Sequence, residues 1–195
     1  VRQRRWWDVL MMRHHVDRYV FIDETGANTQ MSRLYGWGLK SERVVDLVPH
    51  GHCGVDLGIA KRMRVTTFLG AMRSTGLTAP LVIDGPVNGE LFEAYVRKQL
   101  VPTLTPGDIV VLDNLGSHKS PSVREAIEAA GCTVAYLPPY SPDLNPIELL
   151  FSKLKTLLRK HAERTIEALW PRIGQLIPEF SPTECLNDFR HCGYT

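Results

Sequence analysis

The sequence predicts one α/β domain built around a mixed β-sheet. Short, wholly apolar runs at residues 19–22 and 109–112 each end at an aspartate, and such runs are typical of central strands that are covered on both faces. The predicted elements follow in the order three strands, helix, strand, helix, strand and then helices to the end. This order indicates an antiparallel meander followed by right-handed β-α-β crossovers. A length of 195 residues with 44% hydrophobic content suits a single domain with a substantial core.

The first half of the chain supplies the predicted meander and one helix. We predict strands at residues 19–22, 39–48 and 64–72, where apolar and β-branched residues gather. Gly76 and Pro80 are expected to interrupt regular structure after the third strand. A helix capped by Asn88 is predicted next, because apolar residues recur at helical spacing: Leu91, Phe92, Tyr95, Val96 and Leu100.

The second half of the chain alternates strands and helices. Residues 109–112 are the next predicted strand, and residues 132–137 are the last. Between them a helix is expected with Ser120 at its N-cap and Gly131 just past its end. A long helix follows from Pro146, and its apolar face consists of Ile147, Leu150, Phe151, Leu154, Leu157 and Leu158.

Three carboxylates stand at the edges of these elements. Asp23 and Asp113 end the two apolar strands, and Glu148 lies in the first turn of the long helix. If the two strands are parallel neighbours, about 4.8 Å apart, both aspartates lie at the same edge of the sheet. A like-charged pair at this distance calls for a cation or a raised pKa. Three such acids can hold a pair of Mg2+ ions, and paired metals cleave and join phosphodiesters.

Each of these acids has an alternative interpretation. Asn145, Pro146 and Glu148 also match a helix start in which Asn145 is the N-cap and Glu148 completes a capping box. Asp143, in a Ser-Pro-Asp turn, is the rival third acid. Glu24 is the rival first acid, and it is expected to point to the opposite face of the strand from Asp23.

Two sets of polar residues are candidates for contact with DNA. Asn114 and His118 follow Asp113, where they either orient a ligand carboxylate, touch DNA or bond within a turn. Lys155 and Arg159 share a helix face with Glu148, a spacing that suits phosphates flanking the scissile bond. Basic residues gather at 1–18, 61–73 and 151–164 although the net charge is only +2, so solvated surface charge is the alternative interpretation.

Other classes of protein are disfavoured. No apolar run approaches the roughly 20 residues of a membrane helix, so no membrane partner is expected. The four cysteines form no CxxC pair and are expected to be reduced thiols. The run from His50 to Cys53 lacks the second half of a zinc site. A phosphatase is disfavoured because no second aspartate lies two residues after Asp23 or Asp113.

Four segments together resemble the bacterial insertion-sequence branch of the mariner-like DDE transposases. They are FIDETG, DNLGSHKS, LPPYSPDLNPIELLFSKLK and ECLNDFRHCGY, and the resemblance runs from about residue 19 to the C-terminus. It implies a ribonuclease-H-like fold, a five-stranded mixed sheet with helices on both faces. It also implies Asp23, Asp113 and Glu148 as the catalytic, metal-binding triad with Mg2+ or Mn2+. Double-stranded DNA would be the partner, as transposon inverted-repeat ends and TA target, with a homodimer acting by cut-and-paste in the bacterial cytoplasm.

The chain departs from that family pattern in two places. Relatives usually carry N-terminal helix-turn-helix domains, so residues 1–18 are expected to be a basic linker from such a region and residues 19–195 the catalytic domain. About ten additional residues lie near positions 53–64, where a longer hairpin loop would cost little. Two rivals to the transposase function stay open: a nuclease that only hydrolyses, and an inactive remnant or DNA-binding module of the same fold.

Overall fold

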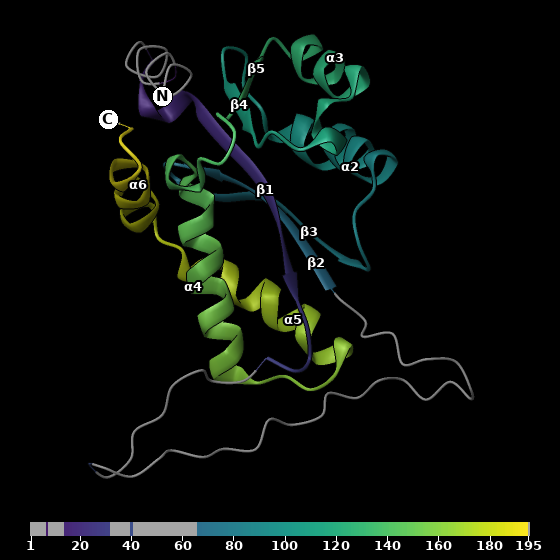
Figure 1. Cartoon of the computed structure of the whole chain (residues 1–195), viewed down its shortest axis with the longest axis vertical. Coiled ribbons are helices and arrows are strands. Elements are labelled where there is room, and N and C mark those ends of the chain that lie inside the picture. Colours follow the sequence, from purple (N-terminus) through teal and green to yellow (C-terminus); the bar gives the residue numbers. More distant parts are fainter. Residues whose placement is uncertain (1–6, 8–13, 32–39, 41–65, 195) are drawn as a thin grey trace.

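A five-stranded mixed sheet forms the centre of the molecule (Figure 1). The computed structural model describes residues 7, 14–31, 40 and 66–194. The strands are β1 (Tyr19–Ala27), β2 (Thr66–Arg73), β3 (Gly76–Asp84), β4 (Ile109–Leu112) and β5 (Thr133–Tyr136), in the spatial order β3-β2-β1-β4-β5. The β1–β2 and β2–β3 pairs are antiparallel, and the β1–β4 and β4–β5 pairs are parallel. The predicted order, an antiparallel meander followed by parallel strands, is therefore confirmed, although β3 was not among the strands predicted for the meander.

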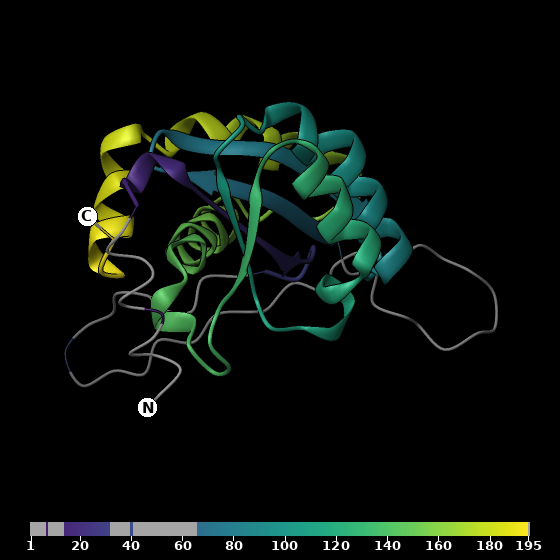
Figure 2. The ribbon, with the colours of Figure 1, turned by 90° about the horizontal axis from the view of Figure 1, so that it is seen from above.

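Helices cover both faces of this sheet (Figure 2). They are α2 (Gly89–Tyr95), α3 (Pro121–Ala129), α4 (Pro146–His161), α5 (Ile166–Leu176) and α6 (Pro182–His191). Because side chains alternate along a strand, Val20 and Ile22 face the core with α2 and α3, while Tyr19 and Phe21 face the core with α4, α5 and α6. Apolar residues on both faces explain why β1 and β4 appear as unbroken apolar runs. Among the described residues, no helix is long and apolar enough to cross a membrane.

Strand β3 corrects the prediction that Gly76 and Pro80 break regular structure. Both lie within it. The strand lies at the edge of the sheet, where the missing N–H of a proline does not interrupt hydrogen bonding between central strands. Next to Pro80, the pairing register shifts between Leu69 and Ala71 of β2, and Ala79 adopts a left-handed φ of 48°. An edge position and a bulge together accommodate residues that would interrupt a central strand.

The remaining predictions along the chain have mixed outcomes. Strand β2 matches the one predicted at 64–72, whereas β1 continues five residues beyond Ile22 to Ala27. Three predicted features lie outside the described residues: the strand at 39–48, the run from His50 to Cys53 and the additional residues near 53–64. Of the strand at 39–48 only Lys40 is described, and it lies in a turn. The cysteines that the structure describes, Cys132, Cys185 and Cys192, are free thiols.

Helix caps were predicted with differing success. The side chain of Asn88 accepts a hydrogen bond from the Leu91 N–H at 2.9 Å, as expected of a cap. The following helix passes through a π-helical turn at Val96–Leu100 and a 3-10 turn at Val101–Thr103. Ser120 does occupy the N-cap of α3, but its hydroxyl pairs with that of Ser122, 2.7 Å away, instead of the backbone.

Candidate active site

An open pocket of about 490 Å3 lies where β1, β4 and the start of α4 meet. Its lining includes all three predicted acids, Asp23, Asp113 and Glu148. Strands β1 and β4 pair in parallel as far as Ile22 opposite Leu112, so Asp23 and Asp113 occupy the next register position on adjacent strands. The condition set for these two strands, that they are parallel neighbours, is met, and the fold brings the three acids to one pocket.

Asp23 is the buried member of the set, with 8% of its surface exposed. Its Oδ1 accepts a hydrogen bond from the Glu24 N–H at 2.8 Å, and its Oδ2 accepts one from Nδ2 of Asn145 at 2.9 Å. Burial raises the pKa of Asp23 to about 7, and the charges of Glu148 and Asp113 act in the same direction. The site therefore concentrates negative charge that a cation would offset.

Glu148 projects from the first turn of α4 and is exposed in the pocket. The capping box proposed for this turn lacks its first half, because the Asn145 side chain makes no capping hydrogen bond. Pro146 at the first helical position has no N–H, and the Glu148 N–H donates to the Asn145 carbonyl oxygen at 3.1 Å. Asn145 thus occupies the predicted N-cap position, but its side chain bonds Asp23 and makes no capping hydrogen bond.

His118 lies on the other side of Asp113 and links it to Glu24. The imidazole is 1% exposed and stacks on Phe92 with ring centroids 4.1 Å apart. Its Nδ1 lies 2.5 Å from Asp113 Oδ1, and its Nε2 lies 3.6 Å from Glu24 Oε2. Burial alone would lower the pKa of His118, but the contacts with the two carboxylates raise it to about 9. The buried ring suits the role of orienting a carboxylate, one of the three interpretations considered for it.

Glu24 lies on the sheet face opposite Asp23, as the alternation of side chains predicts. Its carboxylate faces His118, whose ring packs on Phe92 of the α2–α3 core, whereas Asp23 bonds Asn145 at the start of α4. The described lining of the pocket includes Asp23 and not Glu24. The geometry therefore favours Asp23 over its rival as the first acid.

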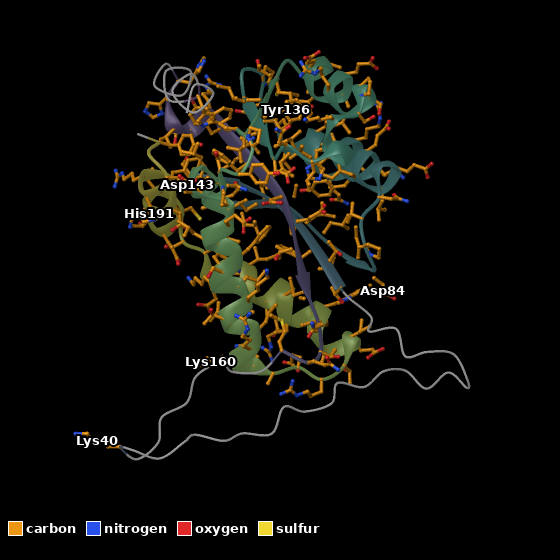
Figure 3. All side chains as sticks on the ribbon, in the orientation of Figure 1. Lys40, Asp84, Tyr136, Asp143, Lys160 and His191 are labelled. Carbon is orange, nitrogen blue, oxygen red and sulfur yellow. The ribbon has the colours of Figure 1, made fainter. Side chains whose placement is uncertain are left out.

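The other predicted polar residues surround the pocket at varying distance. Asn114 is exposed and lines it. Lys155 and Arg159 lie further along α4, are half-buried and are not among its described lining residues. Asp143, the rival third acid, is exposed in the 3-10 turn Pro142–Leu144 and is also outside that lining. Figure 3 shows Asp143 near the start of α4 and Lys160 near its other end.

Two apolar residues at the pocket were not singled out from the sequence. Tyr140 is fully exposed and holds a left-handed φ of 55°, and Leu115 is 48% exposed. Both line the pocket beside the acids. Because an L residue seldom adopts such a φ, an aromatic residue there indicates a local constraint. The only sequence signal was the position of Tyr140 between Pro139 and Ser141-Pro142, which predicts a turn but not exposure.

The donor set matches a hard divalent cation. All three acids offer oxygen ligands, which Mg2+ prefers. Within the described residues, no three His, Cys, Asp or Glu side chains are placed to share one ion. Proteins usually hold Mg2+ with only one or two carboxylates, together with water and substrate phosphates. The adjacent pair Asp23 and Asp113 could therefore supply the protein ligands of one ion.

Known structures share this fold. The chain superposes on the crystal structure of the mariner Mos1 paired end complex with Mg at a TM-score of 0.76 and 16% identity, covering 98% of this chain and 58% of that one. The pre-cleavage Mos1 transpososome gives a TM-score of 0.73 at 15% identity over 95% and 56% of the two chains. The isolated catalytic domain of Mos1 transposase gives a TM-score of 0.67 at 16% identity, covering 98% of this chain and 86% of that one. The predicted ribonuclease-H-like fold is confirmed.

Sequence comparison gives the family. No curated protein matches the sequence. The chain spans little more than half the length of the Mos1 chains in these complexes. At sequence identities near 15%, the likeness supports a shared fold and not a shared activity. The family model described as DDE superfamily endonuclease matches residues 18–169, which includes Asp23, Asp113 and Glu148. Because that match covers well over half of the chain, this protein belongs to the DDE superfamily of endonucleases.

Proposed function

We propose that the chain is the catalytic domain of a transposase from the bacterial insertion-sequence branch of the mariner-like enzymes. It cleaves phosphodiesters at transposon ends and joins the freed ends to target DNA at TA dinucleotides. The observation that carries this proposal is the pairing of β1 with β4, which sets Asp23 beside Asp113 in a pocket that Glu148 also lines. The family match and the Mos1 likeness support it.

Asp23, Asp113 and Glu148 are the residues that would hold Mg2+ or Mn2+. Bound divalent ions would lower the pKa of a water molecule and stabilise charge on the leaving oxygen. Crystal structures of Mos1 complexes with Mg and with Mn support this choice of ions. The chain's own contribution is placement: the Glu24 N–H and Asn145 orient Asp23, and His118 orients Asp113.

The reaction is two successive displacements at phosphorus. In the first, the oxygen of water bonds to phosphorus, the bond to the leaving 3′ oxygen breaks, and that oxygen takes up a proton. In the second, the freed 3′-hydroxyl loses its proton and its oxygen bonds to phosphorus of a target phosphodiester, the bond from that phosphorus to the target 3′ oxygen breaks, and the leaving oxygen takes up a proton. Neither step needs a covalent protein nucleophile, so positioning and electrostatics supply the catalysis.

The wider assembly follows from the same proposal. Residues 19–195 would be the catalytic domain, and residues 1–18 a basic linker that follows a DNA-binding region. Mos1 is solved as a transpososome and as a paired-end complex with a transposon end. By analogy, the active complex here would be a homodimer on double-stranded DNA, acting at the bacterial nucleoid in the cytoplasm.

A cleavage and joining assay tests the proposed function. The chain is incubated with duplexes that carry the element's own ends and with a TA-containing target, in Mg2+ or in chelator. Cleavage and joining that both require Mg2+ would support the proposal. Cleavage without joining would show a hydrolytic nuclease, and binding without cleavage would show an inactive DNA-binding module.

Charge on α4 should set the salt dependence of DNA binding. Lys155 and Arg159 follow Glu148 along one helix face, and we propose that they contact phosphates. Replacing both with Ala should flatten the plot of log affinity against log salt by about two units at most, roughly one for each lost phosphate contact. Fluorescence anisotropy at several salt concentrations measures this slope.

A matched control is available on the same helix. The Lys153 Nζ lies 2.6 Å from Glu184 Oε2 and donates to the Glu179 carbonyl oxygen at 2.9 Å, so this charge is engaged within the protein. Lys153→Ala should leave the salt slope unchanged. An equal change of slope for Lys153→Ala and for the double variant would contradict the assignment of Lys155 and Arg159, and tight repeat-specific binding would reveal an additional recognition element.

His118 should act through Asp113. His118→Ala removes the contact with Asp113 and is expected to lower the cleavage rate by about 10- to 100-fold, the usual cost of losing a group that orients a metal ligand. His118→Asn keeps an N–H donor near the position of Nδ1 and should recover part of the rate. Single-turnover cleavage across a range of Mn2+ concentrations checks both variants. Full activity of His118→Ala would contradict this role.

A further inference from the structure

Asn145 occupies the N-cap of α4 but does not serve as its cap. Its side chain makes no capping hydrogen bond, and the Glu148 N–H is bonded to the Asn145 carbonyl oxygen instead. The Asn145 side chain is instead 4% exposed, and its Nδ2 donates to Asp23 Oδ2 at 2.9 Å. The residue that begins the Glu148 helix is therefore bonded directly to the carboxylate on β1.

This bond completes the orientation of the Asp23 carboxylate. The Glu24 N–H bonds Oδ1 at 2.8 Å and Asn145 bonds Oδ2, so a different donor engages each oxygen. Two donors on separate atoms restrain rotation of the carboxylate about its last single bond. The lone pairs that stay available then have fixed directions, which matters for Mg2+ because it demands near-ideal octahedral geometry.

The other end of the Asn145 amide is also informative. Its Oδ1 is buried and has no hydrogen-bond partner among the described residues, and Asn145 lines the pocket. With Asp23 ionised, the form that binds a cation, exchanging the amide N and O would set Oδ1 against the carboxylate, acceptor against acceptor, so the hydrogen bond to Asp23 fixes the assignment in that form. A buried acceptor left unpaired costs about 1–3 kcal/mol, and an O–H donor bound beside Asp23 would remove that cost.

We infer that Asn145 is a positioning residue of the active site. It fixes the orientation of the Asp23 carboxylate for a divalent cation and offers Oδ1 to a water or hydroxyl group bound next to that carboxylate. This inference rests on the proposed function, since it takes Asp23 to be a ligand of the ion.

The first test compares one substitution at two N-caps. Ser caps helices about as well as Asn but is too short to reach Asp23. Asn145→Ser should weaken Mn2+ binding by about 10- to 100-fold, whereas Asn88→Ser, at the cap that bonds Leu91, should leave it unchanged. Calorimetric titration of the full chain with Mn2+ measures the affinity, and circular dichroism confirms folding. Wild-type Mn2+ affinity in folded Asn145→Ser would overturn the inference.

The second test uses an isosteric change and does not depend on the first variant folding. Asp is as good an N-cap as Asn and suits the helix N-terminus, so a capping residue would tolerate Asn145→Asp. A positioning residue would not, because the new carboxylate would face that of Asp23. The melting temperature of Asn145→Asp in chelator should fall below that of the wild type and recover in part when Mn2+ is added, while Asn88→Asp should not change. A metal-free melting temperature equal to or above the wild type would contradict the inference.

A further variant separates failure of this inference from failure of the proposed function. Asp23→Asn, titrated with Mn2+ in the same way, should lose affinity if Asp23 binds the ion. Wild-type affinity in Asp23→Asn would reject the proposed metal site and the inference together. Loss of affinity in Asp23→Asn with none in Asn145→Ser would reject the role of Asn145 alone.

Discussion

Replacing Glu148 with Gln should reduce DNA cleavage by about 10^3-fold or more while leaving the fold intact. Gln keeps the size of the side chain and loses the charge, and the loss of several kcal/mol of charge stabilisation at a metal site corresponds to rate losses of this order. The fold should tolerate the change because Glu148 is exposed and only its backbone N–H bonds the start of α4. Single-turnover cleavage of an end duplex, beside a thermal melt, measures both quantities.

Asp143→Asn is the matched control for the third acid. Asp143 precedes α4 in an exposed 3-10 turn and lies outside the described lining of the pocket, so its variant should cleave at close to the wild-type rate. Severe loss in Asp143→Asn with full activity in Glu148→Gln would show that Asp143 is the third acid. Wild-type cleavage by Glu148→Gln together with lowered stability of Glu148→Ala would restore the helix-capping interpretation.

Asp23→Asn should abolish cleavage and, in the absence of metal, make the protein more stable. The pKa of Asp23 rises from 3.8 to about 7, first because the side chain is buried and then because Glu148 and Asp113 are negatively charged. A neutral amide avoids the cost of ionising this group in the fold, and this gain exceeds the loss of one hydrogen bond that follows because the NH2 of Asn must face either the Glu24 N–H or Nδ2 of Asn145. The free energy of unfolding at pH 8 should rise by roughly 2–4 kcal/mol, although cleavage is lost.

The pH dependence of this gain follows from the direction of the shift. The folded protein holds the Asp23 proton more tightly than the unfolded chain does, so the contribution of Asp23 to stability is full below about pH 4 and is lost as the pH rises through about 7. The variant and the wild type should therefore differ little at pH 4 and most at pH 8. Urea unfolding in chelator at both pH values measures this difference. A variant less stable than the wild type at pH 8 would contradict the account of Asp23.

The placement of the three acids was predictable because it depends on local patterns. An apolar run that ends at an aspartate marks both the strand and its carboxyl end, so residues 19–23 and 109–113 predicted two strands that each end at an acid, and the structure pairs them. The proline at the start of α4 likewise marked the turn that presents Glu148. In each case the residues that define the element lie next to the residue that carries the chemistry.

Other features depend on partners far away in the sequence. Asn145 has the local pattern of a cap, and its actual partner lies 122 residues away. Pro80 has the local pattern of a break, and only its place at the edge of the sheet makes it compatible with a strand. For His118 the sequence left three roles open, which were contact with DNA, orientation of a carboxylate and a hydrogen bond within a turn, because nothing nearby indicates that the ring stacks on Phe92.

The bond between Asn145 and Asp23 has a consequence for when the enzyme becomes active during synthesis. Contacts across such long separations close late, because the entropy of closing the loop is lost before the contact stabilises the fold. A nascent chain synthesised only as far as Tyr140 has both aspartates but lacks Asn145 and the helix that carries Glu148. Chains that end before α4 should thus lack Glu148 and Asn145 at the pocket and should be unable to cleave DNA.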